Sequence, residues 1–422
     1  MDHEILKRVI MEQRETIQRS VLVKREYEFE PNANYILTGL RRAGKSSLLF
    51  ALVKQLIQQG ATWDQMIYVN FEDERLVEFT LKDFSDLVET VNELSSKKPY
   101  YFLDEVQNVE GWERFARRMA DQKERVYITG SNARMLGAEM EARLGGRYLS
   151  KTIMPYNFRE YLTARNIPFD ETALYTAKRI GRLRNAADDF MHDGGFPESL
   201  QFLDKRAYGE SIYQKVLLGD IALRNEIRKT TGLRILMKKI AETVCQGVSY
   251  TKLKNVVNEI GIQLSKDSVI SYVNYAKEAY LLFFVQNYFA KFNEKASAPK
   301  FYFADNGLLN LLLMDKDSAL LENAVATALK RSFQDNFYYL KSAKTGVDID
   351  FYVPERNLAI QVAYRLSDYD TYEREMNQFR KLSRSFSDAK RFFIVTMGEE
   401  KKIQEEGFEI EVLPLYRFLL EF

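Results

Sequence analysis

The sequence predicts an α/β protein in which an N-terminal parallel sheet is followed by a helical region and a second α/β region. Three short apolar segments rich in β-forming residues support the parallel sheet: Tyr35–Thr38, Pro99–Leu103 and Arg125–Gly130. Because helical patterns separate them, they are expected to lie side by side in one sheet covered by helices. With 422 residues, 46% of them hydrophobic, the chain is too long for one ordinary domain.

The first strand leads into a glycine-rich turn that predicts a P-loop NTPase core. Residues Gly39 to Ser46 match the phosphate-binding pattern G-x-x-x-x-G-K-[ST] at every fixed position, and Ser47–Val53 reads as the helix that follows. Gly39 and Gly44 let backbone N–H groups and the helix N-terminus face phosphate oxygens. The alternative is a glycine-rich turn that ends in Lys-Ser by chance and binds no nucleotide. It is disfavoured because a second motif typical of nucleotide-binding proteins follows.

The P-loop residues have distinct expected roles. Lys45 would bridge the β- and γ-phosphates of ATP, and the Ser46 hydroxyl would ligate Mg²⁺. Arg41 and Arg42 raise the local positive potential, although they could equally face solvent or an acidic neighbour. The predicted nucleotide site also includes Ala43 and Ser47.

The second strand ends in two adjacent carboxylates, Asp104 and Glu105. The carboxyl end of a parallel strand is where such sheets place their chemistry. Asp104 would hold the Mg²⁺ shell, and Glu105 would polarise the water that attacks the γ-phosphate. Alone, this pattern is a common strand-to-turn transition, but after a P-loop it favours hydrolysis over phosphoryl transfer. A GTPase is disfavoured because we find no convincing Asn-Lys-x-Asp motif.

The third strand brings Ser131 and Asn132 to the same sheet edge. AAA-type ATPases place a polar residue there that senses the γ-phosphate, and Asn132 is the better candidate. Farther along, Arg143 and Arg147 flank a Gly-Gly turn, and a guanidinium near the γ-phosphate would stabilise the transition state, in cis or from a neighbouring subunit. The alternative is that both arginines pair with surface carboxylates.

These motifs resemble those of prokaryotic AAA-like ATPases that have a P-loop of the form G-x-R-R-x-G-K-[ST] and a C-terminal domain of unknown function 4143. The resemblance spans nearly the whole chain, and its other matching stretches are Tyr68–Leu76, Leu103–Gln107, Ile128–Ala133, Gly194–Glu198, Tyr302–Leu308 and Glu322–Asn323. It implies ATP binding and hydrolysis by the N-terminal domain. Behind that domain it implies a helical lid, a winged-helix-like segment and a restriction-endonuclease-like fold. It implies no known cellular task.

Shifts in composition and pattern divide the chain into five expected parts. They are an N-terminal helix (1–30), the P-loop ATPase core (31–160), a helical lid (161–238), a winged-helix-like segment (239–292) and the restriction-endonuclease-like domain (293–422). In the fourth part, a helix at Leu253–Ile260, a second helix that follows the N-cap Ser265, and a strand-rich wing at Leu281–Tyr288 indicate helix-turn-helix plus wing.

DNA is a candidate partner, although the sequence leaves this open. Between Asp204 and Lys239, basic residues outnumber acidic ones by nine to four, which fits either a phosphate-binding face or an ordinary solvated helix. The second helix of the winged-helix-like segment offers few Arg or Gln side chains for base edges and several aromatic ones, so a structural or protein-binding role is the alternative.

The last part has the residue order of a restriction-endonuclease-like metal site but lacks two of its groups. Glu322, Asp348 and Asp350 are present. The strand that should carry Asp/Glu-x-Lys reads Gln361-Val362-Ala363, so an amide and an alanine replace a metal-binding carboxylate and the lysine. We therefore expect the fold without nuclease activity.

Composition excludes several other classes. The single cysteine, Cys245, permits no disulfide within the chain, and two histidines exclude most zinc sites and Ser-His or Cys-His catalysis. The N-terminus reads as a charged amphipathic helix rather than a signal peptide, and no apolar run reaches about eighteen residues, so we expect a cytoplasmic protein without a membrane span. The net charge of +1 does not define a partner, and an oligomer is compatible with the sequence.

Together these features predict a Mg²⁺-dependent, ATP-hydrolysing AAA-like protein. Its nucleotide cycle would be coupled to a C-terminal assembly that binds nucleic acid or protein. The alternative is a nucleotide-gated protein-interaction regulator with slow ATPase activity and no role on DNA. Stimulation of the ATPase by DNA would favour the first hypothesis, and stimulation by a partner protein alone would favour the second.

Overall fold

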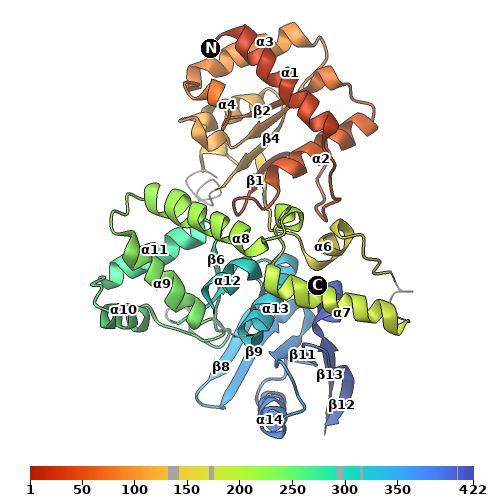
Figure 1. Ribbon diagram of the computed structural model, residues 1–422, viewed down its shortest axis with the longest axis vertical. Helices are drawn as coiled ribbons and strands as arrows, with labels where there is room; N and C mark the ends of the chain where they lie inside the picture. Colours follow the sequence, from red (N-terminus) through yellow and green to blue (C-terminus); the bar gives the residue numbers. More distant parts are fainter. Residues whose placement is uncertain (132–141, 171–174, 292–297, 314–316, 406) are drawn as a thin grey trace. The chain divides into compact units, whose positions relative to one another are not determined.

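The computed structural model describes residues 1–131, 142–170, 175–291, 298–313, 317–405 and 407–422 (Figure 1). These residues form two compact units, Met1–Met154 and Pro155–Phe422, each contiguous in sequence. In the described ranges, no helix combines the length and the apolar character that a membrane crossing requires.

The first unit is a five-stranded sheet with helices on both faces, which confirms the predicted parallel-sheet core. The strands lie in the order β2-β3-β4-β1-β5, and every neighbouring pair is parallel. The described strands are β1 (Asn34–Thr38), β2 (Met66–Asn70), β3 (Tyr100–Asp104), β4 (Arg125–Gly130) and β5 (Tyr148–Thr152), and the helices are α1 (His3–Arg19), α2 (Lys45–Gln58), α3 (Phe84–Leu94) and α4 (Trp112–Asp121).

Alternate residues along the strands supply the two cores of this unit. Ile36 of β1 packs with residues of α1, α3 and α4 on one face, whereas Tyr35 and Leu37 pack with α2 on the other. In the strand register, Thr38 pairs with Gly130 and Asn70 pairs with Asp104. The turns after β1, β3 and β4 therefore meet at one edge of the sheet.

The second unit begins with helices and a short hairpin. The helices are α6 (Phe158–Ala164), α7 (Ala177–Asp193), α8 (Lys205–Gln214), which continues as a π-helix (Lys215–Leu223), α9 (Thr230–Glu242), α10 (Tyr250–Glu259), α11 (Lys266–Glu278) and α12 (Asn306–Leu312). Strands β6 (Leu282–Val285) and β7 (Lys300–Phe303) pair antiparallel. Ser265 caps α11 by accepting from the Ser268 N–H, as the sequence predicts. A winged-helix assignment of α10, α11 and the hairpin stays a prediction.

A six-stranded mixed sheet completes the second unit, with strand order β12-β13-β11-β10-β9-β8. Strands β10, β11 and β13 are parallel, and the other neighbouring pairs are antiparallel. The strands are β8 (Tyr338–Ser342), β9 (Val347–Val353), β10 (Leu358–Val362), β11 (Arg391–Thr396), β12 (Lys401–Glu405) and β13 (Phe408–Pro414), and the helices are α13 (Asp317–Phe333), α14 (Tyr369–Ser385) and α15 (Leu415–Glu421). Met376, Phe379 and Leu382 of α14 belong to the core of this sheet.

The start of the second unit is fixed to its C-terminal elements. The Arg331 guanidinium on α13 donates to Pro155 O at 3.0 Å and to Glu160 Oε1 on α6 at 2.7 Å. Arg159 of α6 donates to Leu420 O of α15. Because the Glu160 side chain is only 1% exposed, Arg331 forms a buried ion pair.

Two glycine-containing stretches of the second unit contact each other. Asp305 accepts from the Gly195 N–H at 2.7 Å and caps α12 through the Gly307 N–H at 2.8 Å. A Cβ on Gly194 would lie 2.1 Å from Asp305 Oδ1, and one on Gly195 would lie 2.2 Å from Tyr156 O. Glycine is therefore required at both positions by close approach.

Candidate functional site

The P-loop connects β1 to α2 at the carboxyl edge of the first sheet. Gly44 is the N-cap of α2 in a left-handed conformation, with φ of 92°. Gly39 has φ of 147°, and a Cβ there would lie 2.0 Å from Ile153 O. Both fixed glycines thus occupy conformations or spaces that other residues cannot adopt without strain. Ala43 is fully buried between them.

Lys45 lies inside the loop rather than in solvent. Its side chain is 4% exposed, and Nζ donates to Gly39 O at 3.1 Å and to Leu40 O at 3.2 Å. The same Nζ lies 3.7 Å from Glu105 Oε1. The structure therefore brings together the predicted phosphate-binding lysine and the predicted water-polarising carboxylate.

Asp104, at the end of β3, is fully buried and accepts hydrogen bonds from two hydroxyl groups. Tyr68 OH of β2 donates to Oδ2 at 2.5 Å, and Thr129 Oγ1 of β4 donates to Oδ1. Burial, followed by the charge of Glu105, raises the pKa of Asp104 above its ordinary value. The hydroxyl groups of Ser46, Thr129 and Tyr68 partly oppose this rise, so both predicted Mg²⁺ residues, Ser46 and Asp104, lie at the same sheet edge.

Glu105 follows Asp104 in a left-handed conformation with φ of 51°. Its backbone N–H donates to Thr129 Oγ1 at 2.9 Å, and its carboxylate accepts from the Gln107 amide. This backbone reversal lets the two adjacent carboxylates take different roles. Asp104 bonds to Tyr68 and Thr129, while Glu105 lies beside Lys45.

The turn after β4 supplies a polar group at the same edge. Ser131 is 1% exposed, and among the described residues its buried Oγ has no hydrogen-bond partner. A buried hydroxyl without a partner is costly, and a phosphate oxygen or a water at this edge would satisfy it. Asn132, the residue predicted to sense the γ-phosphate, lies outside the described residues.

The remaining predicted P-loop residues lie nearer the surface. Arg41 forms an ion pair with Glu72, Nη1 to Oε1, at 3.1 Å. Arg42 is exposed and has a positive φ of 65°, and Ser47 is exposed in the first turn of α2.

Arg143 and Arg147 are paired with carboxylates of α4. Arg143 Nη1 lies 2.7 Å from Glu113 Oε1, and Arg147 Nε lies 2.6 Å from Asp121 Oδ1. Asp121 is a surface carboxylate, as the ion-pair alternative expects for Arg147, whereas the partner of Arg143, Glu113, is buried. A role at the γ-phosphate would require both guanidinium groups to leave these partners.

Sequence reasoning missed Arg25, which links the segment before β1 to the P-loop. Its guanidinium donates to Ala43 O at 3.0 Å and to Met154 O at 2.6 Å. These partners are 18 and 129 residues away in sequence, so no local sequence motif predicts the contact. Arg25 therefore connects the phosphate loop to the end of the first unit.

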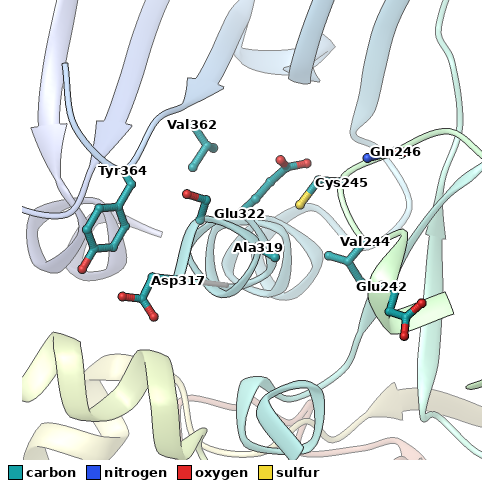
Figure 2. Close-up of a pocket in the computed structure, with 10 residues that line it drawn as sticks. Glu242, Val244, Cys245, Gln246, Asp317, Ala319, Glu322, Val362 and Tyr364 are labelled. Carbon is teal, nitrogen blue, oxygen red and sulfur yellow. The ribbon is translucent and has the colours of Figure 1, made fainter. Parts of the chain in front are cut away.

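The second unit contains two neighbouring cavities next to Glu322. The first, of about 590 Å³, lies over the start of α13, where Figure 2 shows Asp317, Ala319 and Glu322 on the helix, with Tyr364 on one side and Val244 on the other. The second, of about 490 Å³, is lined by Lys300, Asp350, Gln361 and Glu375 among others. Cys245, Gln246, Glu322 and Val362 line both cavities.

A lysine holds the carboxylates of the predicted nuclease-like site. Lys300 Nζ of β7 lies 3.3 Å from Glu322 Oε1 and 3.0 Å from Asp350 Oδ1. Although burial opposes it, the charges of Glu322 and Asp350 raise the pKa of Lys300 above its ordinary value. Burial and then the charge of Glu322 raise the pKa of Asp350 to about 7. This ammonium comes from outside the motif in which the sequence was searched for a lysine.

Gln361 is fully engaged in hydrogen bonds. Its Oε1 accepts from the Asp350 N–H at 2.8 Å, and its Nε2 donates to Glu375 Oε2 at 2.8 Å and to Asp348 O at 3.2 Å. In the part of the chain that the structure describes, the only three metal-ligating side chains within 4.8 Å of one another are His3, Asp86 and Glu89, at the surface of the first unit. Around Glu322, the carboxylates are therefore already paired within the protein: Glu322 and Asp350 with Lys300, and Glu375 with Gln361.

Two family models match the chain. Residues 31–162 match a model described as AAA domain, and residues 184–319 match one described as Domain of unknown function (DUF8612). The second description differs from the domain of unknown function 4143 that the resemblance implies, so the restriction-endonuclease-like assignment stays a prediction.

Relatives are similar over most of their length. An uncharacterized protein of Methanocaldococcus jannaschii is 29% identical over 439 aligned positions, covering 100% of this chain and 97% of the relative. An uncharacterized protein of Haemophilus influenzae is 29% identical over 351 positions, covering 80% and 84%.

Among solved structures, a Walker-type ATPase of Pyrococcus abyssi matches with a TM-score of 0.42 at 14% identity, covering 70% of this chain and 99% of that one. The Orc1 protein of Aeropyrum pernix in complex with DNA matches with a TM-score of 0.28 at 13% identity, covering 72% and 91%. The family match, the P-loop and the five parallel strands agree with one another: residues 31–162 have the P-loop NTPase fold and are similar to AAA domains.

Proposed function

We propose that this protein binds and hydrolyses ATP with Mg²⁺ and couples the nucleotide cycle to its second unit, which binds nucleic acid or another protein. The observation that carries the proposal is the convergence of Lys45, Ser46, Asp104 and Glu105 at one sheet edge. Lys45 and Ser46 begin the helix after β1, whereas Asp104 and Glu105 lie at the end of β3, yet Lys45 Nζ lies 3.7 Å from Glu105 Oε1 and the Ser46 hydroxyl affects the pKa of Asp104.

The groups at this edge suit a nucleoside triphosphate and Mg²⁺. Ser46 and Asp104 offer a hydroxyl and a carboxylate oxygen, the ligand types that Mg²⁺ prefers. The α2 N-terminus and Lys45 offer positive charge to phosphate oxygens, and the buried Ser131 hydroxyl offers a further hydrogen bond. When bound, Mg²⁺ would neutralise the negative charge of the phosphates.

The chain's own residues would then divide the work of hydrolysis. Lys45 would exchange its carbonyl partners for β- and γ-phosphate oxygens. Glu105 would accept a proton from the attacking water and orient it. Asp104, held by Tyr68 and Thr129, would stay an acceptor on both oxygens and keep its orientation.

Substitutions of Lys45 and Glu105 test the two halves of the proposal. Lys45→Ala should weaken ATP binding by about 10- to 100-fold, because a charged hydrogen-bond donor to the phosphates is lost. Lys54→Ala, in the same helix, is the matched control. Calorimetry that gives equal ATP affinity for Lys45→Ala and Lys54→Ala would refute the assignment of the P-loop.

Glu105→Gln should retain ATP binding but slow turnover by about 10²- to 10⁴-fold, because the general base is lost while phosphate contacts remain. Glu110→Gln is the matched control, since Glu110 is exposed in the following turn. Unchanged turnover in Glu105→Gln would show that another group acts as the base.

The class of partner is tested by stimulation of the ATPase. Turnover is measured alone, with duplex DNA and with single-stranded DNA at several salt concentrations. Stimulation that falls with salt supports a nucleic-acid partner, because phosphate contacts release counterions. The absence of any DNA effect on turnover or binding would instead favour a protein partner.

A further inference from the structure

Tyr68 is a buried tyrosine whose hydroxyl bonds to Asp104, one of the two residues predicted to hold Mg²⁺. It lies in the middle of β2, next to β3 in the sheet. Its OH donates to Asp104 Oδ2 at 2.5 Å. The stretch Tyr68–Leu76 is among those that match the resembled family, but the sequence assigns no role to the Tyr68 hydroxyl, because the side chain reads as one more apolar position of a buried strand.

The contacts of Asp104 show what the hydroxyl does. Tyr68 comes from the strand on one side of β3, and Thr129 comes from the strand on the other side. Tyr68 holds Oδ2, and Thr129 holds Oδ1. A carboxylate held at both oxygens by donors from opposite sides cannot rotate about its Cβ–Cγ bond without losing one of them. The orientation of the carboxylate is therefore set by its two neighbouring strands.

The ring of Tyr68 and its hydroxyl have separable roles. The ring packs edge-on against Phe50 of α2, with 5.1 Å between ring centroids, and belongs to the core between sheet and helix. Phenylalanine would retain this packing. The hydroxyl is needed only for its hydrogen bond to Asp104.

We propose that Tyr68 is a positioning residue for Mg²⁺: its hydroxyl orients Asp104 and so sets the affinity of the site for the divalent cation, not for the nucleotide. The proposal rests on the proposed function, since it concerns the same ATP site. Residues that orient metal ligands typically contribute 10- to 100-fold to metal affinity. Tyr68→Phe should therefore weaken divalent-cation binding by about that factor.

Metal binding is measured without relying on turnover. Wild type and Tyr68→Phe are both prepared with Glu105→Gln, and Mn²⁺ binding in the presence of ATP is followed by electron paramagnetic resonance. ATP affinity is measured separately in EDTA. Tyr68→Phe should lose about 10- to 100-fold in Mn²⁺ affinity, with metal-free ATP affinity within twofold of the parent.

Tyr127→Phe is the matched control. Tyr127 is a buried tyrosine of β4 that stacks on Phe102, and it should leave Mn²⁺ affinity unchanged. A second variant, Thr129→Val, removes the donor to the other oxygen of Asp104 and should weaken Mn²⁺ binding in the same direction. It tests the same idea if Tyr68→Phe folds poorly.

The outcomes separate this proposal from the proposed function. Mn²⁺ affinities within twofold of the parent for both Tyr68→Phe and Thr129→Val would overturn the positioning role while leaving the ATPase intact. An equal loss of metal-free ATP affinity would show that Tyr68 merely supports the fold of the site. A parent protein that binds ATP neither with nor without Mn²⁺ would refute the proposed function itself.

Discussion

Replacing Arg331 with methionine should destabilise the second unit by several kcal/mol. The Glu160 side chain is 1% exposed and that of Arg331 is 12% exposed, so the pair is largely shielded from water. Removing one partner of a buried pair typically costs about 3–5 kcal/mol, because the other charge loses its compensation. Since Arg331 keeps some exposure, we expect about 3 kcal/mol. For a unit of this size this corresponds to a fall of roughly 6–12 °C in melting temperature.

The two tryptophans allow each unit to be followed separately. Trp63 and Trp112 both lie in the first unit, so their fluorescence follows that unit alone, whereas far-UV circular dichroism follows both. Arg331→Met should shift the dichroism transition of the second unit and leave the fluorescence transition in place. Lys330→Met is the matched control, because its partner Asp335 is 84% exposed and such pairs contribute at most about 1 kcal/mol.

Two results would refute this reasoning. Melting of Arg331→Met within about 1 °C of Lys330→Met would show that the buried pair makes no net contribution. Equal shifts of the fluorescence and dichroism transitions would show that the two units unfold as one. The double variant Arg331→Met with Glu160→Gln should recover part of the loss, since it removes the buried charge as well.

Three further predictions concern the remaining sites. Arg143→Ala and Arg147→Ala should each slow ATP hydrolysis if the arginine reaches a γ-phosphate. If a neighbouring subunit supplies that arginine, the activity per molecule should rise with protein concentration. Wild-type turnover in both variants would establish the ion-pair role. Purified protein with Mg²⁺ or Mn²⁺ should leave linear, supercoiled and single-stranded DNA uncut, because Gln361 and Ala363 stand where a carboxylate and a lysine are needed; cleavage that disappears in Asp350→Ala would contradict this. Burial raises the pKa of Asp305 from 3.8 to about 6, so the stability that protonated Asp305 contributes below pH 4 should be lost as the pH rises to about 6. When the melting temperature is measured between pH 4 and 7, it should depend less on pH in Asp305→Asn than in the wild type. The same pH dependence in both proteins would show that Asp305 does not titrate in this range.

Local pattern was sufficient for the core of the first unit. The apolar segment before Asp104 and the strand Arg125–Gly130 are formed as expected. A parallel strand is buried on both faces and therefore has a continuous apolar run that can be recognised in the sequence. The glycine spacing of the P-loop likewise fixes a strand–turn–helix unit. The fixed residues of that motif therefore meet at one edge, although their roles stay predictions.

Contacts between distant residues could not be predicted in the same way. Tyr68 and Asp104 are 36 residues apart, and only the pairing of β2 with β3 brings them together. Lys300 reaches Asp350 across 50 residues and from a different sheet. A search for a lysine two positions after Gln361 cannot find it, because the ammonium enters the cavity from β7.

The sequence positions of the contacts that close each unit have a consequence for synthesis on the ribosome. The first unit has its whole sheet once β5 has emerged, and all five strands lie before Met154. The second unit is different, because Arg159 in its first helix bonds to Leu420 in α15, 261 residues later. The nucleotide-binding fold can therefore form during translation, whereas α6 must wait, partly unsupported, until α15 has been made. Chaperone dependence should accordingly fall on the second unit.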